Sequence, residues 1–496
     1  MNWLDSLVGF FSPISAVRRV AARNVLAAYE AGEPSRMRQF YRDRSSQNEV
    51  VQRGAVNIRT QARHFARNHD LARGALRTIV NNVVGPRGIG IEPQPRRADG
   101  SIQSDYAKAL LEAWRDWQKA PEVTHSLSWA RLQRAAVRAW VRDGEVFAQL
   151  ILGLRPDLDH GTRVPFSLEV FEADFVPLDY SEPSRRIVQG IERNTWGRPV
   201  ALHALKSDPS TLSSINYSGN TKRIPWERVL HLAMLDHLGQ IRGVSEFASI
   251  ITRLEDVKDY EESERVAAKI AAMLTAYVKK GTPDLYVPDS GADPREINFA
   301  PGMVIDDLGQ GEEIGMIDSK RPNPNLITFR QGQLRAVAAG IGASYSSLAR
   351  DYGGTYSAQR QELVEQWVHY ATLADEFVGQ FVAPVWETFV SMAHVSGVVR
   401  RPSDVQETTA DDAIFVATEM PWIDPMKEAQ GAQALIGAGL ASEIEMIRKR
   451  GRNPNDVLEQ IATFRKAAEE RGLKFSTDAS ALDPAANGGG DNAPQT

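Results

Sequence analysis

Apolar residues recur at helical spacing through the first third of the chain. Between residues 58 and 79 they fall loosely on one side of a helix, while four arginines project elsewhere. The run Asn81-Asn82-Val83-Val84-Gly85-Pro86 should end this helix, because glycine and proline terminate helices. The apolar positions are Ile58, Ala62, Phe65, Ala66, Leu71, Leu76 and Ile79, and the arginines are Arg59, Arg63, Arg67 and Arg73.

Two further helices are predicted from Ser104 and from Ser128, and the second should end at Asp143-Gly144. Their tryptophans keep helical spacing. We interpret these side chains as core rather than as a binding platform. They are Trp114, Trp117, Trp129 and Trp140.

From Glu145 to about Leu235 the hydrophobic period changes. Short runs rich in Val, Ile, Phe and Leu alternate there with Pro, Gly and Asp. This pattern is typical of a largely antiparallel sheet, so the region should form a β domain.

Residues 244–280 contain neither glycine nor proline, and their apolar residues keep helical spacing. We therefore predict a single helix of about 37 residues, roughly 55 Å long at the usual rise per residue. Its first half is acidic, which indicates contact with water or with a repelled polyanion. Its second half contains Ala267, Ala268, Ala271 and Ala272, whose small side chains would let neighbouring helices approach closely.

Between Gly281 and Asn325 prolines and glycines alternate with short apolar runs, which predicts a small β-rich insert between helices. A second helix should follow from Leu326, and a loop around Gly353-Gly354 should precede a helix from Ser357 that kinks at Pro384. From Asp424 the pattern predicts three short helices, and the last 20 residues should be a disordered tail.

The composition indicates a globular protein of roughly three units, at ~150 residues per domain. The chain has 496 residues, 42% of them hydrophobic and 24% charged. It has no cysteine, which excludes disulfides, Cys-based zinc sites and a cysteine nucleophile. No apolar run reaches the ~18 residues of a membrane span, and we read the apolar N-terminus, which Asp5 and Pro13 interrupt, as a docking helix rather than a signal peptide.

The net charge of −5 conceals an asymmetry. The first 100 residues hold 16 Arg, no Lys and 8 acidic residues, a net of +8, whereas the rest holds 42 basic and 55 acidic residues, a net of −13. The arginine-rich start can be a solvated helical face or a patch that meets nucleic acid or an acidic partner.

Familiar catalytic motifs are missing. No lysine follows a glycine, so there is no Walker A motif, and neither HExxH nor GxSxG occurs. His231 and His237 are six residues apart and fit a strand and a loop better than a metal site. The acidic pairs fit solvated loops better than a divalent-ion site. They are Asp306-Asp307, Glu312-Glu313 and Asp411-Asp412. The residues thus favour a structural or binding protein that needs no cofactor.

The order of these elements, with short motifs between them, resembles a tailed-bacteriophage portal protein of the lambda family over roughly residues 20–475. The motifs begin with Asn81 to Gly85. Those that follow are Trp114-x-x-Trp117, Arg142-Asp143-Gly144-Glu145, Gly190-Ile191-Glu192, Gly197-Arg198-Pro199, Ile224-Pro225, Val229-Leu230-His231, Gln240-Ile241-Arg242-Gly243-Val244, Pro301-Gly302, Tyr356-Ser357 with Arg360, and Ile423-Asp424-Pro425 with Lys427-Glu428.

The resemblance implies an α+β fold of portal-type architecture, with long stem helices, a β-rich wing and clip, and a helical crown. The expected parts are an N-terminal helical region of the wing (1–143), the β-rich wing (144–243), a first stem helix (244–280), the clip (281–325), a second stem helix (326–349), the tunnel loop (350–357), a kinked helix returning to the wing (358–423), the helical crown (424–475) and the tail (476–496).

The family further implies a non-enzymatic ring, a dodecamer by analogy, that conducts double-stranded DNA into and out of the capsid. It would sit at the portal vertex of the virion after assembly in the host cytoplasm, with no membrane. Its other partners would be the terminase large subunit, the head–tail connector protein and the major capsid protein. Subunits would meet at the four alanines above, and DNA would pass a loop made of Arg350, Tyr352, Gly353, Gly354, Thr355 and Tyr356.

Two other functions stay open at this point. One is a metal-dependent nucleic-acid-processing enzyme with a site built from the acidic pairs. The other is a monomeric DNA-binding adaptor that uses the arginine-rich start. The acidic first half of the helix expected over residues 244–280 favours the conduit, because a strongly basic channel would hold DNA by counterion release and stall its sliding.

Overall fold

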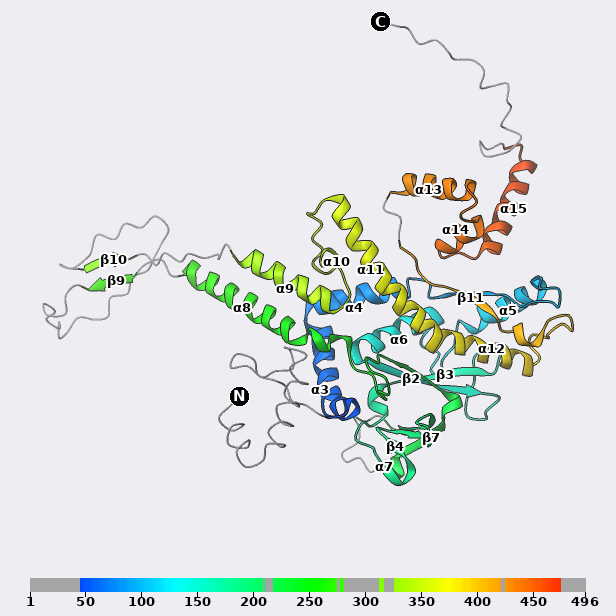
Figure 1. Ribbon diagram of the computed structural model, residues 1–496, viewed down its shortest axis with the longest axis horizontal. Coiled ribbons are helices and arrows are strands. Elements are labelled where there is room, and N and C mark those ends of the chain that lie inside the picture. The colour runs from blue at the N-terminus through cyan, green and yellow to red at the C-terminus, as the bar shows by residue number, and fades with distance from the viewer. Residues whose placement is uncertain are drawn as a thin grey trace, which may run out of the picture. The chain divides into compact units, whose positions relative to one another are not determined.

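The computed structural model describes residues 45–207, 209, 217–273, 277–280, 312–315, 325–420 and 424–473. Its contacts divide the chain into residues 1–50 and 51–496, and the second unit holds nearly all described elements. Helices and antiparallel sheets are both present, which confirms the α+β class (Figure 1). Within the described ranges no helix has the length and apolar character needed to cross a bilayer.

The first described helices are α3 (Gln47–Asn68) and α4 (Asp70–Val83). The prediction of one continuous helix there is wrong, because His69 has extended backbone angles and separates them. Neither a glycine nor a proline lies at this break. The predicted end is confirmed, since α4 stops before Gly85, whose φ is +71°. Helices α5 (Ser104–Trp117) and α6 (Trp129–Asp143) also lie where the pattern predicted them.

The predicted β region is confirmed as two antiparallel sheets. The first has the order β3-β2-β8, with β2 at its centre, and the second has the order β4-β5-β6-β7. A separate pair joins β1 (Gly90–Pro93) to β11 (Ala413–Val416). The strand bounds are β2 Glu145–Leu152, β3 Phe166–Glu172, β4 Ile187–Val188, β5 Ile191–Arg193, β6 Pro199–Leu205, β7 Thr221–Pro225 and β8 Val229–Ala233, and a short helix α7 (Tyr217–Asn220) precedes β7.

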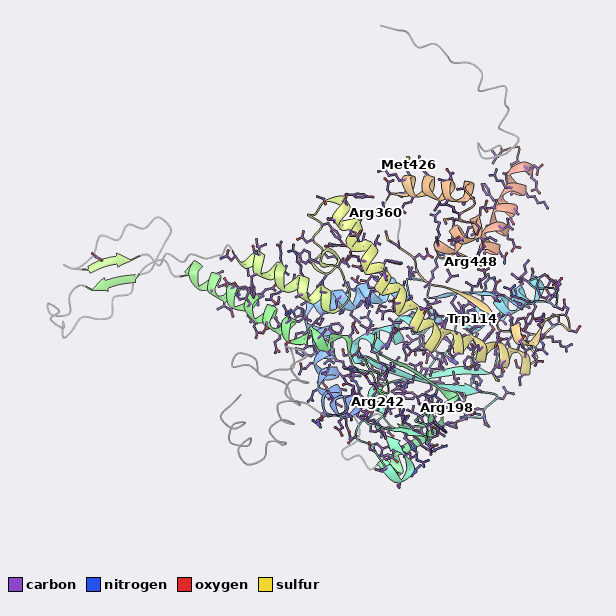
Figure 2. All side chains as sticks on the ribbon, in the orientation of Figure 1. Trp114, Arg198, Arg242, Arg360, Met426 and Arg448 are labelled. Carbon is purple, nitrogen blue, oxygen red and sulfur yellow. The ribbon has the colours of Figure 1, made fainter. Side chains whose placement is uncertain are left out.

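The predicted tryptophan core is confirmed. Trp114, Trp117, Trp129 and Trp140 are all buried. The rings of Trp114 and Trp117 stack with centroids 4.7 Å apart, and Trp114 meets Trp386 edge-on at 5.3 Å. Figure 2 labels Trp114 beside α12 (Ala383–Val395), the helix that supplies Trp386. This cluster ties the N-terminal helices to a segment more than 250 residues later in the chain.

The expected helix over residues 244–280 is shorter in the structure. A 3₁₀ turn covers Glu246–Ser249, α8 runs over Ile251–Met273, and Tyr277–Lys280 form strand β9. The prediction was wrong at both ends. Ser245 caps the 3₁₀ turn by accepting a hydrogen bond from the backbone of Phe247, and β9 pairs antiparallel with β10 (Glu312–Gly315), a long-range contact that helical periodicity does not contain.

Helix α9 (Leu326–Gly340) runs antiparallel beside α8 (Figure 1). Arg253 donates to Gln333 at 3.0 Å, and the rings of Tyr260 and Phe329 lie 4.8 Å apart. The second expected stem helix over 326–349 breaks after α9, and α10 covers Tyr345–Ala349. The break occurs at Gly342, whose φ is +65° and whose missing Cβ makes room for the ring of His369.

Helix α11 (Tyr356–Phe377) continues through a π-helical turn over Val378–Val382 into α12. The helix is therefore irregular near Pro384, where the kink was predicted. The irregularity is this wider turn, which ends directly before the α12 segment that holds the proline. The three predicted C-terminal helices are confirmed as α13 (Pro425–Gly437), α14 (Glu443–Lys449) and α15 (Pro454–Glu470). Of the predicted clip strands, those before residue 312 lie outside the described residues, as does the C-terminal tail beyond residue 473.

Candidate functional site

Glu145, the first residue of β2, is the centre of a buried polar network. Its carboxylate accepts hydrogen bonds from Arg242 at 2.6–3.0 Å, from Arg59 at 3.3 Å and from His231 at 3.0 Å. The backbone N–H of Gly243 donates a further bond at 3.0 Å. Glu145 and Arg242 are fully buried, and Arg59 is 3% exposed. The network joins α3, β2, β8 and the loop before α8.

The negative charge of Glu145 is balanced by the cationic and hydrogen-bond-donating groups around it. Burial alone would raise the pKa of Glu145, but Arg242 and His231 outweigh it and hold that pKa well below its usual value. Arg242 also donates to the backbone carbonyls of Gln189 at 2.7 Å and Ala173 at 3.3 Å. The guanidinium is thus satisfied on several sides, as a buried charge requires.

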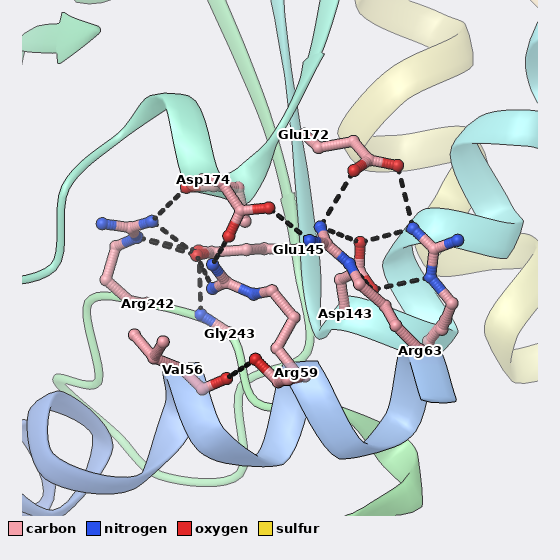
Figure 3. A network of polar contacts seen from close by, with 12 residues as sticks. Val56, Arg59, Arg63, Asp143, Glu145, Glu172, Asp174, Arg242 and Gly243 are labelled. Carbon is pink, nitrogen blue, oxygen red and sulfur yellow. Dashed lines mark hydrogen bonds and ion pairs between the residues drawn. The ribbon is translucent and has the colours of Figure 1, made fainter. Parts of the chain in front are cut away.

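A second group of carboxylates extends the network toward the surface (Figure 3). Arg63 reaches from α3 to Asp143 at 2.8 Å and to Glu172 at 2.9 Å, and it also pairs with Asp174. Arg142 donates to Asp143 at 2.7 Å and to Glu172 at 2.9 Å. Burial would raise the pKa of Asp174, but Arg59 and Arg63 lower it below its usual range.

Two glycines let the backbone close around this centre. Gly144 has a φ of +91°, and a Cβ there would lie 2.4 Å from the carbonyl carbon of Val244. A Cβ on Gly243 would lie 2.1 Å from the oxygen of Gly144. Neither position leaves space for a side chain.

Two arginines of the arginine-rich start therefore have a different role from either one proposed for that region, whereas Arg53, Arg67, Arg73 and Arg77 are exposed. Arg59 and Arg63 are internal ion-pair partners, neither a solvated face nor an exposed nucleic-acid patch. Arg59 lies on the buried face of α3, four residues after Ala55 and three before Ala62. The position of Arg59 between two buried alanines was the sequence signal for its burial. It was missed because the arginines were expected to project away from the apolar side of the helix.

Every residue of the predicted tunnel loop from Arg350 to Tyr356 is exposed. Arg350 has a φ of +55° and ends α10, and its guanidinium contacts Thr78 at 3.4 Å and the hydroxyl of Tyr352 at 3.5 Å. It forms no ion pair with a described acid. Asp351 instead accepts from Tyr345 at 3.0 Å and from the backbone of Gly353 at 3.2 Å.

The loop is anchored at its second end by Thr355. Its hydroxyl accepts a hydrogen bond from the backbone of Ala358 at 3.4 Å and so caps α11. Tyr352 is 57% and Tyr356 is 52% exposed, so both hydroxyl groups lie on the surface of the single chain. The six predicted residues thus form one continuous exposed segment between α10 and α11.

The other expected sites differ in how much the structure describes. Ala267 is half-buried and Ala268 is exposed on α8, whereas the side chains of Ala271 and Ala272 lie outside the description. Asp306 and Asp307 also lie outside it. His231 lies on β8 and His237 in the loop after it, as predicted. In the part of the chain that the structure describes, no three His, Cys, Asp or Glu side chains gather as a metal site would require.

Residues 33–373 match the model of the family described as "Phage portal protein, lambda family". The chain belongs to this family. Relatives along most of its length include the probable portal protein of Halomonas phage phiHAP-1, with 23% identity over 83% of this chain and 80% of that one, and the portal protein of Escherichia phage N15, with 25% identity over 83% and 84%. Portal protein B of Escherichia phage lambda is 20% identical over 84% of each chain.

Among solved structures, the chain is similar to a protein of the neck of the native GTA particle, at 14% identity and a TM-score of 0.43 over 86% of this chain and 98% of that one. Portal proteins are structural virion components that form ring oligomers at the capsid vertex. This chain therefore belongs to a phage portal conduit.

Three motifs of the portal resemblance meet at one carboxylate. Arg142 to Glu145, Val229 to His231 and Gln240 to Val244 are far apart in the sequence, yet Glu145 accepts hydrogen bonds from His231, Arg242 and Gly243. These portal motifs hold the scaffold together. The loop from Arg350 to Tyr356, by contrast, has its polar side chains exposed at the surface.

Proposed function

We propose that this chain forms the DNA conduit of a phage portal and that its loop over residues 350–356 touches the DNA in the channel. The observation that carries the proposal is that this loop is exposed along its whole length and anchored at both ends. The family supplies the ring and its place at the capsid vertex.

The chemistry of the loop suits contact with a moving polyanion. Tyr352, Thr355 and Tyr356 carry hydroxyl groups, which can bond phosphate oxygens without the counterion release that makes lysine- and arginine-rich surfaces hold DNA. Arg350 is the one cation of the segment. Gly353 and Gly354 lack side chains and give the loop freedom to change its backbone angles as the DNA passes.

Deletion of Gly353 and Gly354 tests this role. The deletion leaves the Thr355 cap of α11 in place, so rings and procapsids should form normally. The encapsidated DNA should be shorter, or fewer particles should keep full-length DNA. Thr355→Ser retains the capping hydroxyl and is the matched control. Wild-type DNA length and yield in the deletion variant would show that the loop does not engage DNA.

Subunits of the ring should meet along the alanine-rich half of α8. Ala268 is exposed in the single chain, and its small side chain would allow a neighbouring helix to approach. Ala268→Trp should leave a folded monomer that does not form rings, whereas Glu262→Trp on another face of α8 should assemble. Native mass spectrometry measures both, and intact Ala268→Trp rings would move the contact elsewhere. The same measurement gives the subunit number, which we propose to be twelve.

The segment between α8 and α9 should be the clip that binds the terminase large subunit and later the head–tail connector protein. It follows α8 and precedes α9 in the chain, and its described strands β9 and β10 pair antiparallel. Replacing residues 283–322 with a short Gly-Ser linker should abolish terminase binding in a pull-down with intact rings. Retained binding would place the dock on another surface, such as the one that meets the major capsid protein.

The proposed conduit has no enzymatic activity of its own. The relatives are structural portal proteins, and the described residues that could bind a metal do not converge. Purified rings should leave linear double-stranded DNA intact in the presence of Mg²⁺ or Mn²⁺. Metal-dependent cleavage that copurifies with the ring would favour the processing-enzyme alternative.

A further inference from the structure

The surface of α4, α6 and the loop after α4 is rich in arginine. Asp70 begins α4, but residues 71–91 and 129–142 contain seven arginines, no lysine and no acidic residue. Two of the seven are engaged within the chain, Arg142 by carboxylates and Arg134 by the backbone carbonyl of Pro86 at 2.7 Å. We call the other five the arginine face. They are Arg73, Arg77, Arg87, Arg131 and Arg138.

The packing of the two helices brings these arginines together. Helix α4 packs on α6 (Figure 1). Arg73 and Arg77 are four residues apart, so they share one side of α4. Arg131 and Arg138 are seven residues apart and share one side of α6. The hydrogen bond from the backbone of Ile89 to the side chain of Gln133, at 2.7 Å, holds the loop that carries Arg87 against α6.

Arg138 is a partly buried cation whose charged neighbours are also cations. Burial and the charges of Arg142, Arg77 and Arg73 lower its pKa below the ordinary value. Among the residues that the structure describes, no side chain forms a hydrogen bond or an ion pair with Arg138, Arg73 or Arg77. Partial burial of an unpaired charge beside like charges costs free energy. An anion bound from outside the chain would remove this cost.

The arginine face lacks the apolar side chains of a protein-binding surface. Protein interfaces usually have an apolar or aromatic core. Helices α4 and α6 and the loop over residues 84–89 are described along their whole length, and none of their large apolar side chains is exposed. Guanidinium groups bind phosphate oxygens in pairs. A cationic face without apolar anchors therefore suits the phosphates of nucleic acid better than a protein.

The arginine face lies on a helix that also supports the loop over residues 350–356. The guanidinium of Arg350 contacts the hydroxyl of Thr78 at 3.4 Å, and Thr78 follows Arg77 directly in the chain. Helices α10 and α11, which flank that loop, both pack on α4. The loop proposed to touch DNA and the arginine face are thus held by the same helix.

We propose that the arginine face binds backbone phosphates of the DNA in the conduit and retains the duplex there. The inference rests on the proposed function, because it needs DNA to pass this chain. The hydroxyl groups of the loop can bond phosphates without displacing counterions, whereas the arginines displace them and so bind in a salt-dependent way. The loop would therefore permit sliding, and the arginine face would resist it.

The salt dependence of DNA binding tests this role. Purified full-length rings are titrated with a short labelled duplex at several salt concentrations. The combined variant Arg73→Gln, Arg77→Gln and Arg138→Gln should flatten the slope of log affinity against log salt by about two to three, because each lost phosphate contact removes about 0.9. Its affinity at about 0.1 M salt should fall about tenfold or more.

The matched control removes the same charge elsewhere. Arg155, Arg198 and Arg228 are exposed and lie outside α4 and α6. Arg155→Gln, Arg198→Gln and Arg228→Gln combined should keep the wild-type slope. Equal slopes for the two combined variants would overturn the inference, because binding would then follow the net charge of the ring and not the arginine face.

The stability of Arg138→Gln rings checks the premise that Arg138 has no counter-charge. Removing an unpaired, partly buried cation should leave the urea midpoint unchanged or raise it. A lower midpoint would reveal an acidic partner of Arg138 within the assembled ring. The arginine face would then be a protein contact, and the inference would be wrong.

Photocrosslinking locates the contact in filled heads. The chain has no native cysteine, so Arg77→Cys and Arg198→Cys each provide a single thiol for a photoreactive maleimide. The Arg77→Cys label should crosslink to DNA, whereas the Arg198→Cys label should not. Crosslinks from Arg77→Cys to protein alone would show that another protein covers the arginine face.

The failure of this inference can be told apart from the failure of the proposed function. Rings that lose DNA retention when Gly353 and Gly354 are deleted, but keep the wild-type salt slope in the combined arginine variant, would overturn only the inference. Wild-type protein that forms no rings would count against the proposed function itself.

Discussion

The charged centre around Glu145 and the three C-terminal helices are opposite cases within one chain. At Glu145 a fully buried carboxylate finds Arg242, Arg59, His231 and a backbone N–H inside its own subunit. In α13–α15, apolar side chains such as Met426 at 72% and Ile461 at 51% remain exposed. The described contacts thus complete the charged centre internally, whereas local caps and a few polar contacts hold the C-terminal helices.

The difference also concerns the kind of interaction. A buried ion-pair network is costly to desolvate and is tolerated only when every charge is paired, so it fixes one geometry. Apolar faces are non-directional and accept a partner from outside. The centre around Glu145 therefore resists change, whereas apolar contacts of α13–α15 place fewer constraints on geometry.

The strongest way to break this comparison is Glu145→Gln. The substitution keeps the size of the side chain but leaves Arg242 buried without its counter-charge and removes one of the two carboxylates that pair with Arg59. Breaking a buried pair from one side costs about 3–5 kcal/mol, so the urea midpoint of the wing should fall sharply. Glu169→Gln removes the half-exposed partner of Lys222 and should cost at most about 1 kcal/mol. Equal midpoints for the two variants would show that the centre is not internally completed.

A smaller effect is expected from Gly144→Ala. The residue has a φ of +91°, and its new methyl group would meet the backbone of Val244 and Ser245. Strain of this kind costs about 1–3 kcal/mol, measured by the same urea midpoint. Gly153→Ala shares a positive φ but meets open space, so it reports the backbone strain alone. A Gly144→Ala loss no larger than that of Gly153→Ala would mean that the close approach at Gly144 is unimportant.

The sequence predicted the elements that depend on local signals. Gly144 ended α6 where expected, and the caps at Asp424, Ser442 and Asn453 begin the three C-terminal helices that the pattern indicated. Short apolar runs between turn residues likewise predicted an antiparallel β region, though not its division into two sheets. These features depend on residues that are neighbours in the chain, so they could be predicted from a single sequence.

The contacts between distant segments could not be predicted. The helix expected over 244–280 failed at its end because Tyr277–Lys280 pair with Glu312–Gly315, and no local pattern contains that pairing. Arg59 was misjudged because its partner Glu145 is 86 residues away. The loop at residues 350–356 came from family resemblance, and its contact with DNA remains a prediction.

The smallest effect concerns Glu192, an intermediate case between the two regions. Arg223 donates to its two oxygens at 2.8 and 3.1 Å, and His203 contacts it at 3.2 Å. Arg223 and His203 lower the pKa of Glu192 to about 2, against the opposing effect of burial, which raises it. A carboxylate with a lowered pKa contributes its stability above the ordinary pKa and loses it as the pH falls through the lowered one.

Glu192→Gln should therefore be less stable than wild type at pH 7, by at most about 1 kcal/mol because Arg223 is 46% exposed and salt screens the pair. The difference should shrink below pH 4.5 and vanish as the pH approaches 2, where the wild-type carboxyl is protonated and resembles the amide. Urea midpoints across that range measure it, with Glu227→Gln as an exposed control. A pH-independent difference would mean that Glu192 acts through its shape and hydrogen bonds alone. Stabilisation by internal charge pairing would then be confined to the centre around Glu145.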